Sequence, residues 1–242
     1  MARVWINGKS RVEVEDAEGV NIVHLTVDGK EIAVSGGQTI LEAVARMPGI
    51  GNIPALCYHP ALKPCGGCQL CTVEVSEDGG SKFRFVAACL YPVKEGLVVK
   101  TNTKMVRELR KGIIELLLAR CPTVKRIQEL AKEYGVEQPR FALPGEGCIH
   151  CSLCLRACQE IIGKSAISLR AIYGEAAPFY AYQLSEEDCI GCEDCAFVCP
   201  TGAIQMGPNG KPVLPKVKIP YSEVEAMSKS TFFSNSLGCG SY

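Results

Sequence analysis

The sequence predicts an α+β protein in which two small domains are joined by helices, and three observations support this. Up to about residue 100, short alternating apolar runs are separated by turn signals and interrupted by one helix signal. Two helical patterns follow, and from about residue 138 the composition shifts to Pro, Gly and Cys. We therefore expect domains at residues 1–100 and 138–215, a helical linker at 101–137 and a C-terminal tail at 216–242.

The strand pattern of the N-terminal part predicts a β-grasp. Strand-like runs at 20–27 and 31–34 flank Asp28-Gly29, a dipeptide typical of a tight hairpin turn. Thr39 is a good cap for a helix from Ile40 to about Arg46. Three further strands are expected at 70–75, 83–88 and 97–100. An extra hairpin at 3–14, with Asn7-Gly8 as its turn, is expected to cover a sheet edge rather than to dock a partner.

The sequence of the linker, residues 101–137, predicts two helices. The first, at about 103–119, carries an apolar stripe that should pack against a core. The residues of this stripe are Val106, Leu109, Ile113, Leu116 and Leu117. The second helix, at about 123–134, has Gly135 at its C′ position.

The cysteines form three groups that supply 12 expected cluster ligands among the 15 cysteines of the chain, and two groups share the spacing C-x2-C-x2-C-x3-C. This is the spacing of bacterial ferredoxins, in which the last cysteine of each run ligates the other cluster. The first [4Fe–4S] cluster is then assigned to Cys148, Cys151, Cys154 and Cys199, and the second to Cys189, Cys192, Cys195 and Cys158. Structural zinc sites and disulfides are the alternatives. Three cysteines at successive two-residue intervals, occurring twice, favour iron. The first run departs from the ferredoxin pattern at one position, because Cys158 is followed by Gln159 where the second run has Pro200.

The third group offers five thiols to a site that needs four: Cys57, Cys65, Cys68, Cys71 and Cys89. A plant-type [2Fe–2S] site needs a loop with separated cysteines, a CxxC pair and a distant fourth cysteine. Cys68 and Cys71 supply the pair, and Cys71 leads into a strand-like run. Cys65 and Cys68 also have ligand spacing, so the residues themselves leave this alternative open.

The segment PALCYHPALKP at 54–64, followed by CGGCQLCTVEV at 65–75, resembles the [2Fe–2S] domain of complex I-type subunits. The same module begins the large iron–sulfur subunit of NADH dehydrogenase, the electron-input region of iron hydrogenases and the small diaphorase subunit of NAD-linked hydrogenases. The resemblance implies that Cys57, Cys68, Cys71 and Cys89 bind the cluster. Cys65 would then be a buried, uncoordinated neighbour.

Residues 101–120 are similar to the helix that follows in these subunits, where the family usually adds a cluster held by one His and three Cys. This chain has only Cys121 there, with no histidine or further cysteine before Cys148. We therefore expect that cluster to be absent and Cys121 to be a buried small apolar residue.

The composition excludes several function classes. With 26 basic and 26 acidic residues the net charge is zero, so neither nucleic acid nor an anionic membrane is expected as a partner. The sequence contains no run of 18 apolar residues, so no membrane-spanning helix is predicted. The N-terminus shows no apolar export segment, and cysteines kept reduced indicate the cytoplasm.

Catalytic signals are also missing. No complete G-x-G-x-x-G motif is present, so no flavin or dinucleotide site is predicted. The three histidines, His24, His59 and His150, are expected to have packing or surface roles ahead of tuning a cluster. Chemistry on an organic substrate is therefore expected on another subunit.

The resemblance implies an electron-transfer subunit with one [2Fe–2S] and two [4Fe–4S] clusters in a hetero-oligomer. Its partners would be a flavin-bearing subunit that oxidises NAD(P)H and a further redox unit of the hydrogenase, formate dehydrogenase or ferredoxin-linked kind. The alternatives are a free-standing polyferredoxin carrier and an iron–sulfur redox sensor. The sensor would need a nucleic-acid or other output surface, which the charge balance does not provide.

Overall fold

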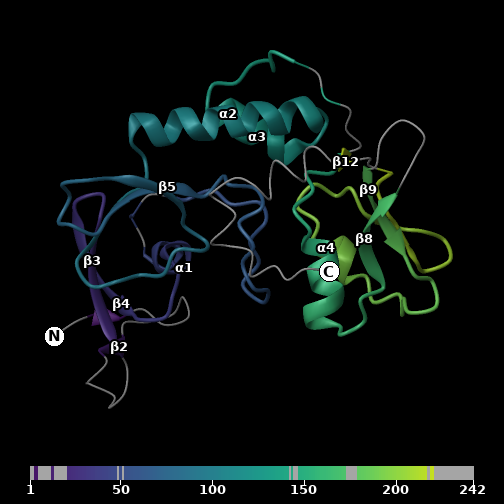
Figure 1. Cartoon of the computed structure of the whole chain (residues 1–242), viewed down its shortest axis with the longest axis horizontal. Helices are drawn as coiled ribbons and strands as arrows, with labels where there is room; N and C mark the ends of the chain where they lie inside the picture. Colours follow the sequence, from purple (N-terminus) through teal and green to yellow (C-terminus); the bar gives the residue numbers. More distant parts are fainter. Residues whose placement is uncertain are drawn as a thin grey trace. The chain divides into compact units, whose positions relative to one another are not determined.

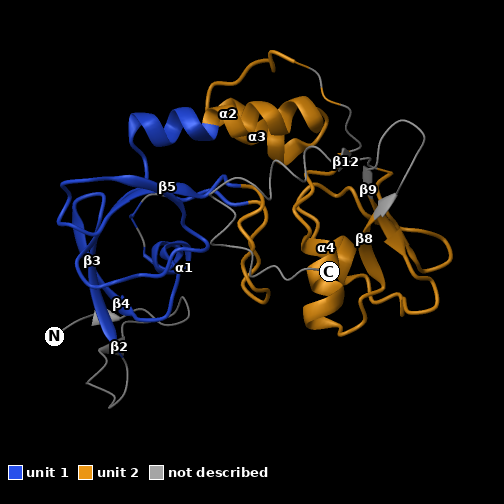
Figure 2. Ribbon diagram, viewed as in Figure 1, with its two compact units in different colours: residues 1–55, 69–110 blue, residues 56–68, 111–242 orange. Residues whose placement is uncertain are grey.

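The computed structural model describes residues 3–4, 12–13, 21–47, 49–50, 52–141, 143, 147–172, 179–216 and 219–220. The chain divides into two compact units, coloured separately in Figure 2. Unit 1 comprises residues 1–55 and 69–110, and unit 2 comprises residues 56–68 and 111–242. This division differs from the expected boundaries, because residues 56–68 group with the C-terminal part of the chain.

Unit 1 is built on a five-stranded mixed sheet in the order β4-β3-β7-β5-β6. Its strands are β3 (Ile22–Val27), β4 (Lys30–Ser35), β5 (Thr72–Ser76), β6 (Arg84–Ala87) and β7 (Leu97–Lys100). Figure 1 labels β3, β4 and β5 of this sheet. Strands β3 and β7 are parallel, and the other pairs are antiparallel. The expected strands are therefore confirmed. Of the expected N-terminal hairpin, β1 (Arg3–Val4) pairs antiparallel with β2 (Val12–Glu13), and its turn lies outside the described residues.

The turn between β3 and β4 has the predicted chemistry. Asp28 and Gly29 have φ angles of 49° and 79°, as a type I′ turn requires. The Asp28 carboxylate also accepts hydrogen bonds from the backbone N–H of Thr101 at 2.7 Å and from its hydroxyl at 2.5 Å. The turn is thereby tied to the residue that follows β7.

Helix α1 (Ile40–Ala45) begins at the predicted cap. The Thr39 hydroxyl accepts from the Glu42 N–H, and the Glu42 carboxylate accepts from the Thr39 N–H at 2.8 Å, which is a complete capping box. The N–H of Leu41 donates to the carbonyl of Ala88 at 3.0 Å. The helix therefore holds the backbone next to Cys89.

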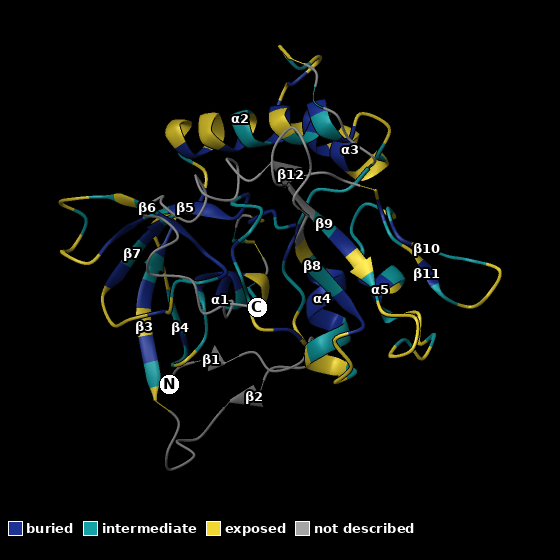
Figure 3. Cartoon of the chain, turned by 45° about the vertical axis from the view of Figure 1, so that its right-hand side comes forward, coloured by how far each residue is buried: buried dark blue, intermediate teal, exposed yellow. Residues whose placement is uncertain are grey.

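Helix α2 (Lys104–Arg120) confirms the first linker helix but corrects its buried face. Leu109 and Leu116 of the expected stripe are 39% and 50% exposed. Val106 is buried as expected, but the rest of the buried side includes Arg110, Ile114 and Leu118, and Figure 3 shows the exposed residues along the other side. The prediction was wrong because a charged residue occupies this face: Arg110 donates to the carbonyl of Thr72 at 2.8 Å within unit 1.

Helix α3 (Lys125–Glu133) confirms the second linker helix. It ends at Tyr134, and Gly135 has a φ of 68° at the predicted C′ position. Arg140, farther along, forms a two-pronged ion pair with Glu115 of α2, at 2.8 and 2.7 Å. This pair fixes the chain shortly before the first cysteine run.

The ferredoxin part of unit 2 consists of short elements around its cysteine loops. Helix α4 (Leu153–Arg156) continues into the π-helical turn η1 (Ala157–Ile161), and α5 (Asp194–Phe197) lies in the second run. The segment between the two cysteine runs forms a hairpin of β8 (Ile167–Ile172) and β9 (Phe179–Leu184), with β12 (Ile219–Pro220) beside β9. A small hairpin joins β10 (Gln205–Met206) to β11 (Pro212–Val213). Among the described residues, no helix is both long and apolar enough to cross a membrane.

Candidate iron–sulfur sites

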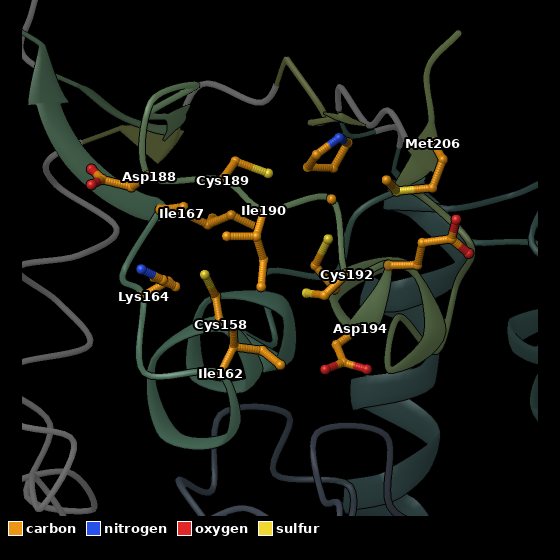
Figure 4. Close-up of a pocket in the computed structure, with 15 residues that line it drawn as sticks. Cys158, Ile162, Lys164, Ile167, Asp188, Cys189, Ile190, Cys192, Asp194 and Met206 are labelled. Atoms are coloured by element: carbon orange, nitrogen blue, oxygen red, sulfur yellow. The ribbon is translucent and has the colours of Figure 1, made fainter. Parts of the chain in front are cut away.

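One cysteine-lined cavity opens beside the second run. Figure 4 shows Cys158, Cys189 and Cys192 pointing into a common space. Cys195, of α5, completes the lining, whereas Cys158 comes from η1 of the first run. The space measures about 370 Å³ with its opening to solvent included. Four thiols from two separate segments therefore surround one cavity.

A lysine and a close backbone contact hold the loop of this cavity. The Lys211 ammonium, in the β10–β11 hairpin, donates to the carbonyls of Cys189 and Glu186, the latter at 3.1 Å. At Gly191, with a φ of 70°, an added Cβ would lie 2.7 Å from the carbonyl oxygen of Gly210. Only glycine fits this approach. Of the four thiol residues, Cys192 is exposed while Cys195 is buried.

The other cavity, of similar size at about 310 Å³, lies beside the first run and is called the first cavity, whereas the cavity beside the second run is called the second cavity. Its cysteines are Cys148, Cys151, Cys154 and, from the second run, Cys199. Each run thus contributes its last cysteine to the other run's cavity. These are the two sets of four that the spacing predicts. Cys154 and Cys195 also share one core with Tyr182 of β9, so the two cavities are adjacent.

Burial keeps three of these thiols protonated in the absence of iron. It raises the pKa of Cys151 to about 12 and the pKa of Cys195 to about 11, and it also raises the pKa of Cys154. Because thiolates are the ligands, iron must displace these protons as it binds. Soft sulfur donors in a largely apolar setting suit iron–sulfur clusters.

Cys199 differs from the other thiols. Burial raises its pKa, but hydrogen bonds from the Thr201 hydroxyl and from the N–H groups of Thr201, Ile204 and Ala203 outweigh burial and leave the pKa lowered. The N–H of His150 similarly donates to the sulfur of Cys148 at 3.4 Å. Such N–H···S bonds are among the factors that set cluster potentials.

His150 and Cys121 lie near the first cavity, in surroundings that the sequence did not indicate. The Arg120 guanidinium lies 2.6 Å from Nδ1 of His150, and burial, aided by that charge, lowers the pKa of His150 to about 4. His150 is therefore neutral at ordinary pH. Cys121 is fully buried as expected, and its pKa is raised to about 11 by burial and then by Cys148, which places it near that cavity.

The other two histidines make surface and turn contacts. His24, on β3, donates its N–H to Glu95 and is largely exposed, and Nδ1 of His59 accepts the N–H of Ala61 at 3.3 Å. Surface and turn roles account for both contacts.

Three cysteines of the third group come together in unit 2. The N–H of Cys68 donates to the sulfur of Cys57 at 3.3 Å. The side chains of Cys65 and Cys68, and then burial, raise the pKa of Cys57. All three pack against a core that includes Cys151 of the first run, and the Cys65 thiol points to the Cys151 carbonyl at 4.0 Å. Cys65 was expected to be buried and uncoordinated, but it is only half-buried, and it lies between two groups of expected ligands.

The remaining two cysteines of this group belong to unit 1. Cys71 immediately precedes β5, and its carbonyl accepts the N–H of Ala88 at 3.1 Å, which sets it beside the backbone that leads to Cys89. Both cysteines are 1% exposed. The chain passes from unit 2 to unit 1 between Cys68 and Gln69, inside the expected ligand set.

The cysteines suit iron–sulfur clusters by donor type, spacing and N–H···S bonds. Over the described part of the chain, no group of three or more His, Cys, Asp or Glu side chains already has the arrangement of a metal site.

Comparison with known families agrees with this chemistry. Residues 21–104 match the 2Fe-2S iron-sulfur cluster binding domain, and residues 143–206 match the 4Fe-4S dicluster domain. The chain is therefore an α+β iron–sulfur protein that combines one [2Fe–2S] domain with one two-cluster [4Fe–4S] domain.

Its relatives are subunits of larger oxidoreductases. The chain is 30% identical to a subunit of the NADH-quinone oxidoreductase of Rhizobium meliloti (strain 1021), over 77% of its own length and 24% of the relative. It is 31% identical to the alpha subunit of the NADPH-Fe(3+) oxidoreductase of Geobacter sulfurreducens (strain DL-1 / KN400), over 79% of its own length and 25% of the relative. It thus spans about a quarter of these relatives.

A solved relative is a chain in the crystal structure of NAD+-reducing [NiFe]-hydrogenase in the H2-reduced state. The likeness has a TM-score of 0.59 and 26% identity, and covers 74% of this chain and 85% of that one. The chain is an iron–sulfur protein related to these two groups, as the complex I-type and diaphorase-type resemblance implied.

Proposed function

We propose that this chain relays single electrons through one [2Fe–2S] and two [4Fe–4S] clusters inside a multisubunit oxidoreductase. The observation that carries the proposal is the pair of adjacent cavities, each lined by four cysteines drawn from both runs. The [4Fe–4S] ligand sets are Cys148, Cys151, Cys154 with Cys199, and Cys189, Cys192, Cys195 with Cys158. The [2Fe–2S] ligands are Cys57, Cys68, Cys71 and Cys89.

Bound clusters supply one-electron chemistry, with potentials set by charge, hydrogen bonding to sulfur and exposure. The chain's own residues control those factors differently at the two cavities. Cys151 and Cys154 are buried, whereas Cys192 is exposed, as are Ile190 in the same loop and Phe197 at the end of α5. This asymmetry favours the second cavity as the point of electron exchange with a partner.

The proposed partners are a flavin-bearing subunit that oxidises NAD(P)H and a further redox unit of the hydrogenase, formate dehydrogenase or ferredoxin-linked kind. The relatives' names support this proposal, because they include NADH- and NADPH-linked enzymes and a hydrogenase. A hetero-oligomer in the cytoplasm follows from the same proposal. Size-exclusion of the natively purified protein tests it, because a free-standing carrier would elute alone.

The crossed ligand sets are tested by Cys-to-Ser variants and electron paramagnetic resonance (EPR). We expect Cys199→Ser to remove the same signal as Cys148→Ser, and Cys158→Ser to remove the same signal as Cys192→Ser. Cys121→Ser, near the first cavity but outside both sets, should keep both signals. Pairing of Cys199→Ser with Cys192→Ser would overturn the crossed assignment.

The [2Fe–2S] ligands need their own test, because Cys65 touches Cys57. Cys57→Ser should remove or strongly change the [2Fe–2S] signal, whereas Cys65→Ser should leave four ligands in place. Loss of the signal in Cys65→Ser with retention in Cys57→Ser would assign Cys65 in place of Cys57.

A further inference from the structure

Arg156 is a buried cation inside the first cysteine run. It ends α4, between Cys154 and Cys158, and is only 2% exposed. Its guanidinium reaches the loop of residues 56–68, where Nη2 donates to the carbonyl of Cys57 at 2.9 Å and Nη1 donates to the carbonyl of Lys63. Both partners are backbone carbonyls of the loop that carries three cysteines.

A second contact from the same segment holds this loop. The Glu160 carboxylate, in η1, accepts the N–H of Lys63 at 2.9 Å. The peptide groups of Lys63 are thus held by Arg156 at the carbonyl and by Glu160 at the N–H. The first run therefore fixes the position of the Cys57 loop through three backbone contacts.

Arg156 also carries a charge that these contacts do not balance. Over the described residues, no carboxylate lies within ion-pair distance of Arg156, and its Nε is buried without a hydrogen-bond partner. A buried guanidinium that faces only carbonyl dipoles is costly, because its charge lacks a counter-ion. A buried anion next to it would offset that cost.

The proposed [2Fe–2S] site provides such an anion. Cys57 is the residue whose carbonyl Arg156 holds, and it packs in one core with Cys151 and Ala157, next to Arg156. Four thiolates outweigh the positive charge of the iron–sulfide unit they bind, so a loaded site is negatively charged. The counter-charge is therefore expected at the thiolates of this loop.

We propose that Arg156 is the positioning residue and the counter-charge of the cluster held by Cys57. This inference rests on the proposed function, since it requires that Cys57 bind the [2Fe–2S] cluster. Reduction adds one electron and no proton to the site, which makes it more negative. A fixed positive charge beside it stabilises the reduced form and raises the reduction potential.

The test compares Arg156→Gln with Arg156→Lys by EPR-monitored redox titration, after iron and sulfide analysis has matched their cluster content. In Arg156→Gln, the oxidised-to-reduced ratio of the [2Fe–2S] cluster at the wild-type midpoint should rise about tenfold, which is a fall of about 59 mV for one electron. Arg156→Lys keeps the charge and should stay close to the wild-type potential. Arg126→Gln, at an exposed arginine of α3, should change nothing.

Two results would overturn the charge role. One is an unchanged [2Fe–2S] potential in a fully loaded Arg156→Gln. The other is an equal fall in the Gln and Lys variants, which would mean that packing alone is affected.

The positioning role has a separate measurement, which also serves if Arg156→Gln does not hold its clusters. Lysine cannot reproduce the two-pronged grip of the guanidinium. Amide hydrogen exchange over residues 57–68 should therefore be faster in Arg156→Lys than in the wild type. Exchange at the wild-type rate would refute this role.

Failure of this inference is distinguishable from failure of the proposed function. If the wild-type protein shows no [2Fe–2S] signal, the proposed function fails. If the signal is present and both Arg156 variants match the wild type in potential and exchange, only the role of Arg156 fails.

Discussion

Replacement of Gly191 by alanine should damage the second cysteine cavity through one backbone contact. Gly191 stands between Cys189 and Cys192 with a φ of 70°, and an added Cβ would be 2.7 Å from the carbonyl oxygen of Gly210. That carbonyl belongs to the turn between β10 and β11, whose Lys211 holds the carbonyl of Cys189. The turn and the cysteine loop cannot both stay in place.

Two costs combine in Gly191→Ala. A residue with a Cβ in the left-handed region costs about 1–2 kcal/mol. The forced contact with Gly210 adds an overpacking cost of about 1–3 kcal/mol. Gly135→Ala is a matched control, because Gly135 has a φ of 68° and nothing lies within 4 Å of its added Cβ. The control should therefore show only the first cost.

The assay follows the loss of visible iron–sulfur absorbance during heating at one fixed scan rate, together with EPR of the reduced protein. Gly191→Ala should lose absorbance at a lower temperature than Gly135→Ala, and its second-cluster signal should be altered or lost. The first-cluster signal should remain. The reasoning would be refuted if the two variants lost absorbance at the same temperature, or if only the first-cluster signal were altered.

Three further predictions concern stability and reactivity. Thr39→Ala breaks the capping box of α1 and should cost about 1 kcal/mol, seen as faster amide exchange in that helix; exchange at the wild-type rate would contradict it. Hydrogen bonds from Arg140 lower the pKa of Glu115 to about 2, against about 4.3 for an unfolded glutamate, so the contribution of the pair is complete above about pH 5 and is lost only as the pH falls towards 2. Glu115→Gln should thus lower the melting temperature by the same amount at pH 5 as at pH 9, and a difference that varies over this range would count against the ion pair. Burial raises the pKa of Cys121 to about 11, so iodoacetamide at pH 8 should leave this thiol unmodified in the folded protein and label it after unfolding, as peptide mass spectrometry can show.

Local signals predicted most of the elements. The capping box at Thr39, the type I′ turn at Asp28-Gly29 and the C′ glycine at residue 135 all act through bonds to near neighbours in the chain. Such signals do not depend on distant contacts, which is why the sequence located these elements within a few residues.

The buried face of α2 was not predictable in the same way. Its apolar residues suggested a stripe through Leu109 and Leu116, yet Arg110 occupies the buried side. A buried arginine needs hydrogen-bond acceptors for its guanidinium, and the acceptor here, the carbonyl of Thr72, is 38 residues away in the chain. Periodicity alone carries no information about such a partner.

By itself, the sequence determined the kind of chemistry, because cysteines two residues apart can wrap a cluster from one short loop whatever surrounds it. It also predicted which four cysteines line each of the two cavities. Only the tertiary structure decided what lies around them: the Cys57 loop packed on the first run, Arg156 and Glu160 holding it, and Cys121 close to Cys148. The physical reason is that ligand spacing is a local property, whereas burial of a charge or a thiol depends on residues that only the folded chain brings together.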